Sequence, residues 1–228
     1  PPYSLFSLLV HLHLFHFSVF FLDTLSRLLY PPYCVGCQKL GSHICQTCLK
    51  QLEPLMVQPA FASRDPAIHW HAIYTYQRPL DALIKTMKCG EVTAIATTLA
   101  KLAYRAFPPK WSPQICTAVP MHQNKQNQRG FNQAELITQQ PAKLLQIPYL
   151  ALLKKTVDTR PQASLSQTAR LNHYQPNTFQ LSQPFTQSDI LLVDDVITTG
   201  ATMQACAQTL LRAGAQRVFC LGLAHSLA

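Results

Sequence analysis

The segment that most constrains the fold is ILLVDDVITTGAT, residues 190–202. Its first four residues are aliphatic with no polar alternation, which is typical of a strand buried on both faces of a parallel sheet. Asp194 and Asp195 follow at the carboxyl end of this strand, where open α/β sheets bind their ligands. Small residues then lead into an apolar pattern of helical period. The segment therefore predicts an α/β fold with a ligand site at this strand end.

The small-residue stretch 198–202, TTGAT, predicts a phosphate-binding loop. Backbone N–H groups at the start of a helix converge on an anion, and the helix dipole favours negative charge there. Gly200 lets the chain approach a ligand closely. Neighbouring carboxylates could bind a sugar diol and help to hold Mg²⁺. We therefore predict a sugar-phosphate site, the alternative being an ordinary turn with solvated aspartates and capping threonines.

A second constraint comes from four cysteines, Cys34, Cys37, Cys45 and Cys48, spaced as CxxC, seven residues, CxxC. Two such turns supply the tetrahedral thiolate set that Zn²⁺ takes in closed structural sites. Because this segment has almost no apolar core, metal binding would supply its folding free energy. Free cysteines or a redox pair are the alternative. The clustering does not fit a secreted disulfide framework, so we expect a reducing, cytoplasmic compartment.

The net charge and an apolar amino-terminal segment indicate which classes of partner the chain could have. The chain has 19 Lys and Arg against 10 Asp and Glu, a formal net charge of +9. This charge suits nucleic acid, a phosphorylated substrate or an anionic membrane surface. Residues 3–22 are about long enough to cross a bilayer but contain three histidines and no signal-peptide features. We expect a dispensable leader, the alternative being a membrane span or a helix that lies on the inner face of the membrane.

The whole chain divides into four predicted parts. They are an apolar leader or helix (1–30), a four-cysteine zinc module (31–53), a proline-rich linker (54–70) and the main domain (71–228). Within the main domain, strand patterns occupy 71–77, 115–120, 190–193 and 217–225. Helical patterns occupy 80–87, 92–107 and 132–145, with Asn132 as a cap and Pro141 expected to kink or split its helix.

Two polar, basic loops flank the predicted site. The loop that follows the strand 115–120 carries Lys125 and Arg129, and Arg129 offers a planar bidentate donor for pyrophosphate oxygens. A surface loop without chemical consequence is the alternative. Residues 154–172 have few apolar anchors, so we expect them to be mobile. Such a loop could close over a sugar phosphate and exclude water, or simply be a loop.

Four motifs in this order resemble the ComF family, also called ComFC or GntX-like. They are the four-cysteine cluster, VPMH followed by RGFNQ (119–133), RPQASL (160–165) with Arg170 and Asn172, and VDDVITTGAT (193–202). The last string is similar to the phosphoribosyl pyrophosphate (PRPP) motif of type I phosphoribosyltransferases. The resemblance covers roughly residues 20–228. It implies an α/β fold with a type I phosphoribosyltransferase-like parallel sheet flanked by helices, and a small N-terminal zinc module. Residues 1–19, Pro141 and the long spacing from Asn172 to Phe179 depart from the family pattern.

The resemblance also implies ligands and site residues. It assigns structural zinc to the four cysteines and the ribose diol to Asp194 and Asp195. The PRPP ligand, bound with Mg²⁺, would further contact Val196 and the 5′-phosphate loop. Val119, Pro120 and Arg129 would face the pyrophosphate side. The loop residues are Thr198, Thr199, Gly200, Ala201 and Thr202.

Two function classes follow from this resemblance, which also implies a role in natural competence and DNA uptake. As a phosphoribosyltransferase, the protein would transfer ribosyl phosphate to an unknown acceptor, with Asp194, Asp195 and Arg129 as its catalytic residues and no obvious general base. As a non-catalytic module, it would bind single-stranded DNA through basic loops and aromatics such as Tyr104, Phe131 or Tyr174. A nucleotide site that regulates DNA handling would combine both. A competence helicase or other DNA-processing proteins are the expected partners.

Overall fold

The computed structural model describes residues 31–56, 65–89, 92–158 and 177–226. The chain divides into two compact units between Leu49 and Lys50. Several predictions therefore lie outside the described residues: the apolar leader, the RPQASL segment, most of the expected mobile loop, and Tyr174. In the part of the chain that is described, no helix has the length and apolar character needed to cross a membrane.

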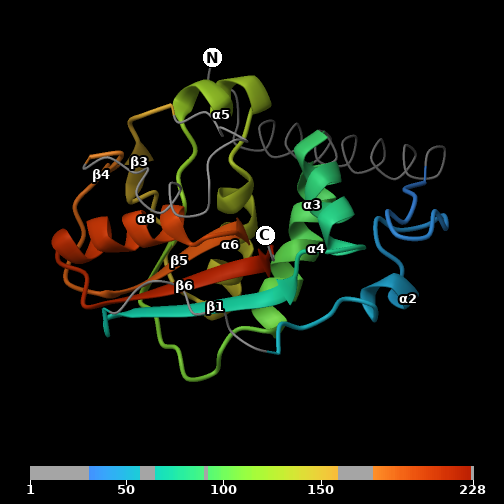
Figure 1. Ribbon diagram of the computed structural model, residues 1–228, viewed down its shortest axis with the longest axis horizontal. Coiled ribbons are helices and arrows are strands. Elements are labelled where there is room, and N and C mark those ends of the chain that lie inside the picture. The colour runs from blue at the N-terminus through green and yellow to red at the C-terminus, as the bar shows by residue number, and fades with distance from the viewer. Residues whose placement is uncertain (1–30, 57–64, 90–91, 159–176, 227–228) are drawn as a thin grey trace, which may run out of the picture. The chain divides into compact units, whose positions relative to one another are not determined.

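The second unit is built on a sheet of four parallel strands in the order β1–β6–β5–β2. Figure 1 shows β1, β6 and β5 side by side. The strands are β1 (Ile68–Thr75), β2 (Ile115–Ala118), β5 (Asp189–Ile197) and β6 (Arg217–His225). The predicted parallel sheet is confirmed. Strand β1 begins earlier than expected, within the range predicted as a linker. The N–H of Leu55, in the same predicted linker, donates to the Ile73 carbonyl of β1 at 2.8 Å.

Both faces of this sheet are buried, as its continuous apolar strands require. One face of β5 and β6 packs with the buried residues of helix α8 (Ala201–Arg212) in a single core cluster. The strand residues in that cluster alternate along the chain: Ile190, Leu192, Val218 and Cys220. The intervening residues are also buried, and helix α6 (Gln133–Leu145) packs against β5 and β2. Because side chains alternate along a strand, α8 and α6 lie on opposite faces.

Three predicted helical patterns of this unit form the helices α3, α4 and α6. Helix α3 (Leu80–Cys89) buries its predicted stripe, and α4 (Val92–Arg105) packs against α3 and α6. Asn132 caps α6 as predicted, since its side chain accepts the N–H of Ala134. The expected split at Pro141 is wrong, because α6 runs through it as one helix. A proline costs a helix one backbone hydrogen bond, and here the buried Pro141 side chain packs within a continuous core-facing stripe.

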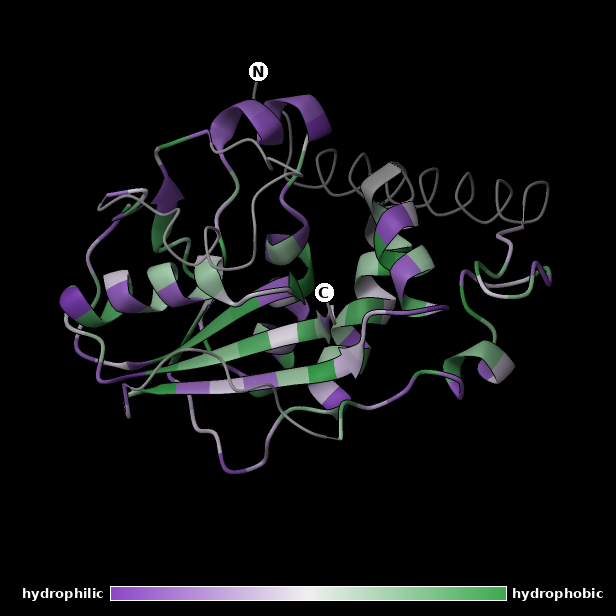
Figure 2. Cartoon of the chain, in the orientation of Figure 1, coloured by the Kyte–Doolittle hydropathy of each residue, from purple (hydrophilic) through white to green (hydrophobic). Residues whose placement is uncertain are grey.

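The polar stretch after β2 differs from its prediction as a loop. Residues Gln123–Arg129 form a short helix, α5, with no buried residue. Figure 2 shows this helix as hydrophilic along its length. It begins at His122, whose ring accepts the N–H of Asn124, and ends at Gly130 with a positive φ of 79°. Local capping at both ends, rather than an apolar face, accounts for a helix that periodicity could not reveal.

The expected mobile loop from residue 154 is also partly ordered. Strand β3 (Leu153–Lys155) pairs antiparallel with β4 (Phe179–Leu181). The apolar side chains Leu153 and Phe179 join the core cluster under α8. This two-stranded sheet therefore packs on the α8 side of the central sheet. Its burial of two apolar residues explains why the segment begins as a strand.

The first unit contains the cysteine segment. An isolated antiparallel bridge joins Tyr33 to Leu40, and the only helix that the structure describes in this unit is α2 (Gln46–Leu49). Of its described side chains, Cys34 and Cys48 are the buried ones. Within residues 31–49, the part of this unit that the structure describes, apolar burial is small, so a metal bound by the cysteines would supply most of the stability of this segment.

Candidate functional site

A polar pocket opens where β5 meets α8. It is lined by Asp194, Val196, Ile197, Thr198, Gly200, Ala201, Thr202 and Met203. All of these residues belong to the end of β5, the connecting loop or the first turn of α8. The pocket therefore contains most of the predicted PRPP-binding segment. Topology explains this, because β5 lies at the centre of the sheet and its carboxyl end meets a helix amino terminus.

The two neighbouring aspartates do not share this pocket. Both lie within β5, which extends to Ile197, so their side chains project to opposite faces. Asp194 points to the α8 face, where it adds to the burial that raises the pKa of the Cys206 thiol. Asp195 is not among the pocket residues. Each carboxylate also accepts the N–H of the next residue, Asp194 at 2.9 Å and Asp195 at 2.7 Å.

The loop between β5 and α8 presents backbone donors. Gly200 has a positive φ of 77° and forms the cap of α8, with no side-chain cap bond. Within the described residues, the N–H groups of Thr199 and Gly200 have no hydrogen-bond acceptor, whereas the N–H of Ala201 donates to Thr199 Oγ1 at 3.4 Å. Amides without an internal acceptor at a helix start are suited to bind an anion. Thr202 lies in the first turn of α8 and lines the same pocket.

Two residues of β6 fix this loop, and sequence reasoning missed both. His225 is buried and forms a hydrogen bond with the backbone of Thr198; burial lowers the pKa of His225 and that bond opposes the change. Gly222 lies beside Ile197, and a Cβ at this glycine would lie 2.4 Å from Ile197 Cδ1 and Cγ1. The register of β6 on β5 could have found them, since Gly222 pairs with Asp194 and His225 with Ile197.

The predicted pyrophosphate side is tied to the acidic strand by a chain of hydrogen bonds. The N–H of Val119, directly after β2, donates to the Val193 carbonyl at 2.9 Å. The buried Asn132 donates its amide to the Val119 carbonyl at 3.1 Å while its oxygen caps α6. These two hydrogen bonds give Asn132, the asparagine of the RGFNQ segment, a structural role. Val119 is buried, Pro120 is half-buried, and Arg129 is exposed at the last residue of α5, outside the pocket.

A half-buried lysine that the sequence did not single out lies near Asp194. Lys155 ends β3, with its ammonium 5.9 Å from the centroid of the Phe179 ring. Burial, followed by the nearby charge of Lys125, lowers the pKa of Lys155. Asp158 and Asp194 oppose that shift, so both carboxylates lie within electrostatic range of this ammonium. A parallel bridge joins Lys155 to His122, at the start of α5. Lysines 155 and 125 thus add positive charge beside the acidic strand.

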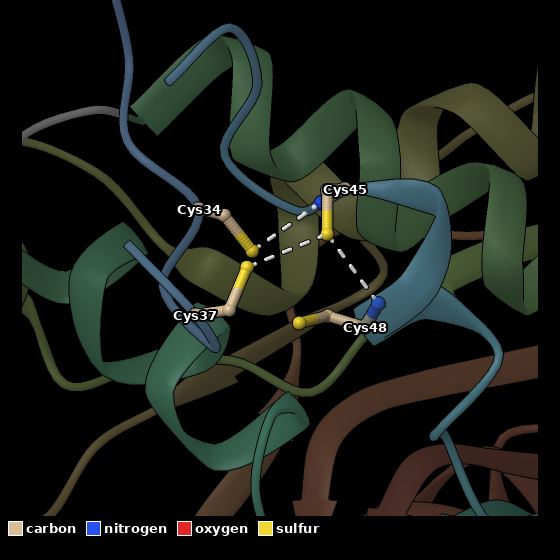
Figure 3. Close-up of side chains that lie close together, drawn as sticks. All are labelled: Cys34, Cys37, Cys45 and Cys48. Atoms are coloured by element: carbon tan, nitrogen blue, oxygen red, sulfur yellow. Dashed lines mark hydrogen bonds between the residues drawn. The ribbon is translucent and has the colours of Figure 1, made fainter. Parts of the chain in front are cut away.

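The second candidate site is the cysteine cluster. The Sγ atoms of Cys34, Cys37, Cys45 and Cys48 all lie within 4.8 Å of one another. Figure 3 shows the four side chains pointing toward one another, with Cys37 Sγ 3.6 Å from Cys45 Sγ. Tetrahedral Zn–S bonds of about 2.3 Å place sulfur atoms at this kind of spacing. The donor set therefore fits a closed tetrathiolate zinc centre.

The pKa values of these neighbouring thiols are shifted in opposite directions. Burial alone would raise the pKa of Cys34, but backbone N–H donors, led by that of Cys45, outweigh it and lower the pKa to about 6. The N–H of Cys45 donates to Cys34 Sγ at 3.3 Å. Burial and the neighbouring sulfurs raise the pKa of Cys48 to about 12. Four adjacent thiolates therefore require a positive ion, as a divalent metal would supply.

Comparison with known proteins adds the family. Competence protein F of Haemophilus influenzae is 34% identical over 209 residues, covering 86% of this chain and 85% of that protein. The chain belongs to the ComF family. DNA utilization protein YhgH of Escherichia coli K12 is 30% identical, covering 83% of this chain and 82% of the relative. Competence protein ComFC of Streptococcus pneumoniae is 25% identical, with 79% and 80% covered.

The second unit of this ComF-family chain matches a known domain. Residues 134–228 match the family described as phosphoribosyl transferase domain, which spans α6 to the end of β6 and includes the pocket. Among solved structures, glutamine PRPP amidotransferase from B. subtilis aligns with a TM-score of 0.39 and 18% identity, over 56% of this chain and 26% of that one. The relatives confirm the predicted family, and the matched domain, the parallel sheet and the cysteine cluster confirm the predicted phosphoribosyltransferase-like fold with an N-terminal cysteine module.

Proposed function

We propose that this ComF-family protein binds PRPP, or a related ribose 5-phosphate ester, with Mg²⁺ in the pocket between β5 and α8. The observation that supports it most directly is one pocket that combines the carboxylate of Asp194 with a loop whose N–H groups, at Thr199 and Gly200, have no acceptor in the described part of the chain. The amides would bind the 5′-phosphate. The carboxylate of Asp194 would bind the ribose hydroxyls, and carboxylate oxygens are also ligands that suit Mg²⁺.

The pyrophosphate half of the ligand would lie toward the β2–α5 loop. Val119 and Pro120 begin this loop, and the hydrogen bond from Val119 to Val193 places it beside the strand that carries Asp194. Lys155 and Lys125 supply positive charge for the phosphate oxygens. Arg129, exposed on α5, is proposed as a further phosphate ligand that reaches the pyrophosphate from outside the pocket.

As an enzyme, the protein would transfer ribosyl phosphate to an acceptor and release pyrophosphate. Bound Mg²⁺ would neutralise part of the pyrophosphate charge as the leaving group departs. Asp194 would orient the ribose and offset positive charge that develops at the ribose carbon, while the loop amides hold the phosphate in place. Asp195, on the opposite face of β5, is proposed to support the strand and the ribose side indirectly rather than to contact the pocket.

Calorimetry with PRPP and Mg²⁺ tests the binding proposal, and release of pyrophosphate in the presence of pooled metabolites or DNA tests turnover. We expect Mg²⁺-dependent binding that the Asp194→Asn variant loses. Wild-type protein that shows no heat of binding, by contrast with a positive control phosphoribosyltransferase in the same buffer, would refute the proposal. Binding without pyrophosphate release would favour a ligand-sensing role over catalysis.

A second candidate function is the binding of single-stranded DNA. Two of the relatives are named for competence and one for DNA utilization, and the net charge of this chain is +9. Lys101, Tyr104 and Arg105 are exposed on α4, with Tyr104 40% exposed, so one helix face combines cations with an aromatic ring. Affinity should fall steeply with salt concentration. Affinity that is independent of salt, or unchanged in a Tyr104→Ala, Arg105→Ala variant, would remove this face from the proposal.

We further propose that the four cysteines hold zinc in a structural role. Removal of the metal by a chelator should increase amide exchange in residues 34–48 and leave the second unit folded, because that unit has its own core. Loss of the entire cooperative unfolding transition on chelation would show that the two units are not independent.

A further inference from the structure

His122 stands at the end of the VPMH motif and caps α5 with its ring. Its Nδ1 accepts the N–H of Asn124 at 3.2 Å. A ring nitrogen that accepts a hydrogen bond carries no proton, so the neutral ring holds its proton on Nε2. The cap thereby fixes the tautomer and makes Nε2 a donor.

This Nε2–H group has no acceptor among the residues that the structure describes. The nearest carboxylate oxygen, Asp158 Oδ2, lies 3.7 Å from Nδ1, on the other side of the ring. Asp158 is itself 3.5 Å from the side-chain amide of Asn124. The side chain of His122 is only 16% exposed, so the ring is held in place by its surroundings. A ring N–H that is fixed in place and has no acceptor in the described part of the chain can donate to a bound ligand.

The surroundings of this ring place it on the pyrophosphate side of the proposed site. A parallel bridge joins His122 to Lys155, whose ammonium is in electrostatic range of Asp194 and Lys125. The loop that leads to His122 is joined to β5 by the hydrogen bond from the Val119 N–H to the carbonyl of Val193, the residue that precedes Asp194. The backbone N–H groups of Lys125 and Gln126 donate to the His122 carbonyl and that of Asn124 donates to the ring, so these three amides of the first turn of α5 have acceptors within the protein.

We propose that His122 is a ligand-binding residue whose Nε2–H donates to the pyrophosphate oxygens of PRPP, next to Lys155 and Lys125. This inference rests on the proposed function. The alternative is that His122 serves only as the cap of α5. The two roles use different ring nitrogens, and they can therefore be separated by substitution.

His122→Asn and His122→Gln separate them. Asparagine is a good helix cap and places an acceptor near the position of Nδ1, but it has no group at the position of Nε2. Glutamine reaches the position of Nε2 with an amide donor and caps poorly. Calorimetry with Mg²⁺ and three probes, PRPP, inorganic pyrophosphate and ribose 5-phosphate, is combined with amide hydrogen exchange of α5.

We expect His122→Asn to keep α5 protected but to weaken PRPP and pyrophosphate binding by about tenfold or more, since one hydrogen bond to a charged group is lost. Ribose 5-phosphate, which lacks the pyrophosphate, should bind the His122→Asn variant with the same affinity as the wild type. His122→Gln should keep most of the pyrophosphate affinity while α5 exchanges faster. Wild-type affinity for all three probes in His122→Asn would overturn the inference and leave the proposed function intact. Failure of the wild type to bind any probe would overturn both.

Discussion

The two ends of strand β5 carry the same side chain in opposite circumstances. At the amino end, the buried carboxylate of Asp189 accepts hydrogen bonds from the guanidinium of Arg217 on β6, whose Nε lies 3.1 Å from both carboxylate oxygens. The N–H of Asp189 also donates to the side chain of Gln114 at 3.0 Å. At the carboxyl end, Asp194 faces a polar pocket and is followed by loop amides at Thr199 and Gly200 that have no acceptor in the described chain.

This difference separates a structural aspartate from a ligand-binding one. The guanidinium of Arg217 lies 5.4 Å from the Phe219 ring centroid and gives Asp189 a partner from within the protein. Buried polar groups that the fold needs are satisfied by the fold. A carboxylate that lines a pocket beside backbone donors is placed to bind a ligand, and this describes Asp194 rather than Asp189. Substituting each aspartate by asparagine tests the distinction with one chemical change.

The largest effect is expected from Asp194→Asn. Loss of the charge should weaken Mg²⁺-dependent PRPP binding by about 100-fold or more, roughly 2.7 kcal/mol, because the sugar and metal contacts are both lost. The free energy of unfolding should change less than in Asp189→Asn, since Asp194 lines a polar pocket whereas Asp189 is buried against Arg217. Calorimetry and urea unfolding measure the two quantities. Asp195→Asn, on the opposite face of β5, is the matched control and should cost less affinity.

The opposite pattern is expected from Asp189→Asn. The ion pair with Arg217 is lost at a buried position, so the free energy of unfolding should fall by about 2 kcal/mol. The half-exposed Arg217 can regain water, which keeps the loss below that of a fully buried pair. Affinity for PRPP should remain within about twofold. A large loss of affinity with unchanged stability would erase the contrast between the two ends.

A smaller effect is expected from Gly222→Ala, which tests how the carboxyl edge is held. The added Cβ would lie 2.4 Å from two side-chain atoms of Ile197, so Ile197 must move, at a cost of about 1–2 kcal/mol in stability. Because Ile197 lines the pocket, PRPP affinity should also fall. Adding Ile197→Ala removes both contacting atoms, and the effects of the two substitutions should then be strongly non-additive. Additive effects would show that this contact does not support the site.

The smallest and most indirect effect concerns the cysteine unit. Zinc requires thiolates, so binding displaces protons and its affinity should rise with pH. The lowered pKa of Cys34, about 6, means that this thiol is already ionised near pH 7, whereas the raised pKa of Cys48 means that it must lose a proton. Fewer than four protons should therefore be released for the four ligands near pH 7. Calorimetry in buffers of different ionisation enthalpy counts them, and a release of four would contradict this account.

Much of the fold was predictable because its signals are local. The apolar run before Asp194, the stripe of α3 and the cap at Asn132 are each encoded within a few residues. The cysteine spacing likewise predicted a cluster that the structure brings together. Helix α5 was missed because caps at His122 and Gly130, not an apolar face, hold it. The predicted split of α6 at Pro141 was wrong because tertiary packing can outweigh the loss of one helical hydrogen bond.

The site was predictable only in part, because its other contributors are distant in sequence. Lys155 reaches Asp194 through the pairing of β3 with β4, and His225 reaches Thr198 through the register of β6 on β5. The sequence also did not predict that Asp194 and Asp195 lie on opposite faces of β5, because this depends on the strand continuing beyond both residues. The string TTGAT could indicate a phosphate loop, but only the structure distinguishes which of its amides have an internal acceptor.

A crystal structure of the protein with Mg²⁺ and PRPP tests the ligand site at the end of β5 without any substitution. We expect a phosphate whose oxygens lie about 2.9 Å from the backbone nitrogens of Thr199 and Gly200, with the ribose hydroxyls or the metal on Asp194. A ligand bound elsewhere on the chain, with the β5–α8 pocket holding no phosphate, would contradict this expectation.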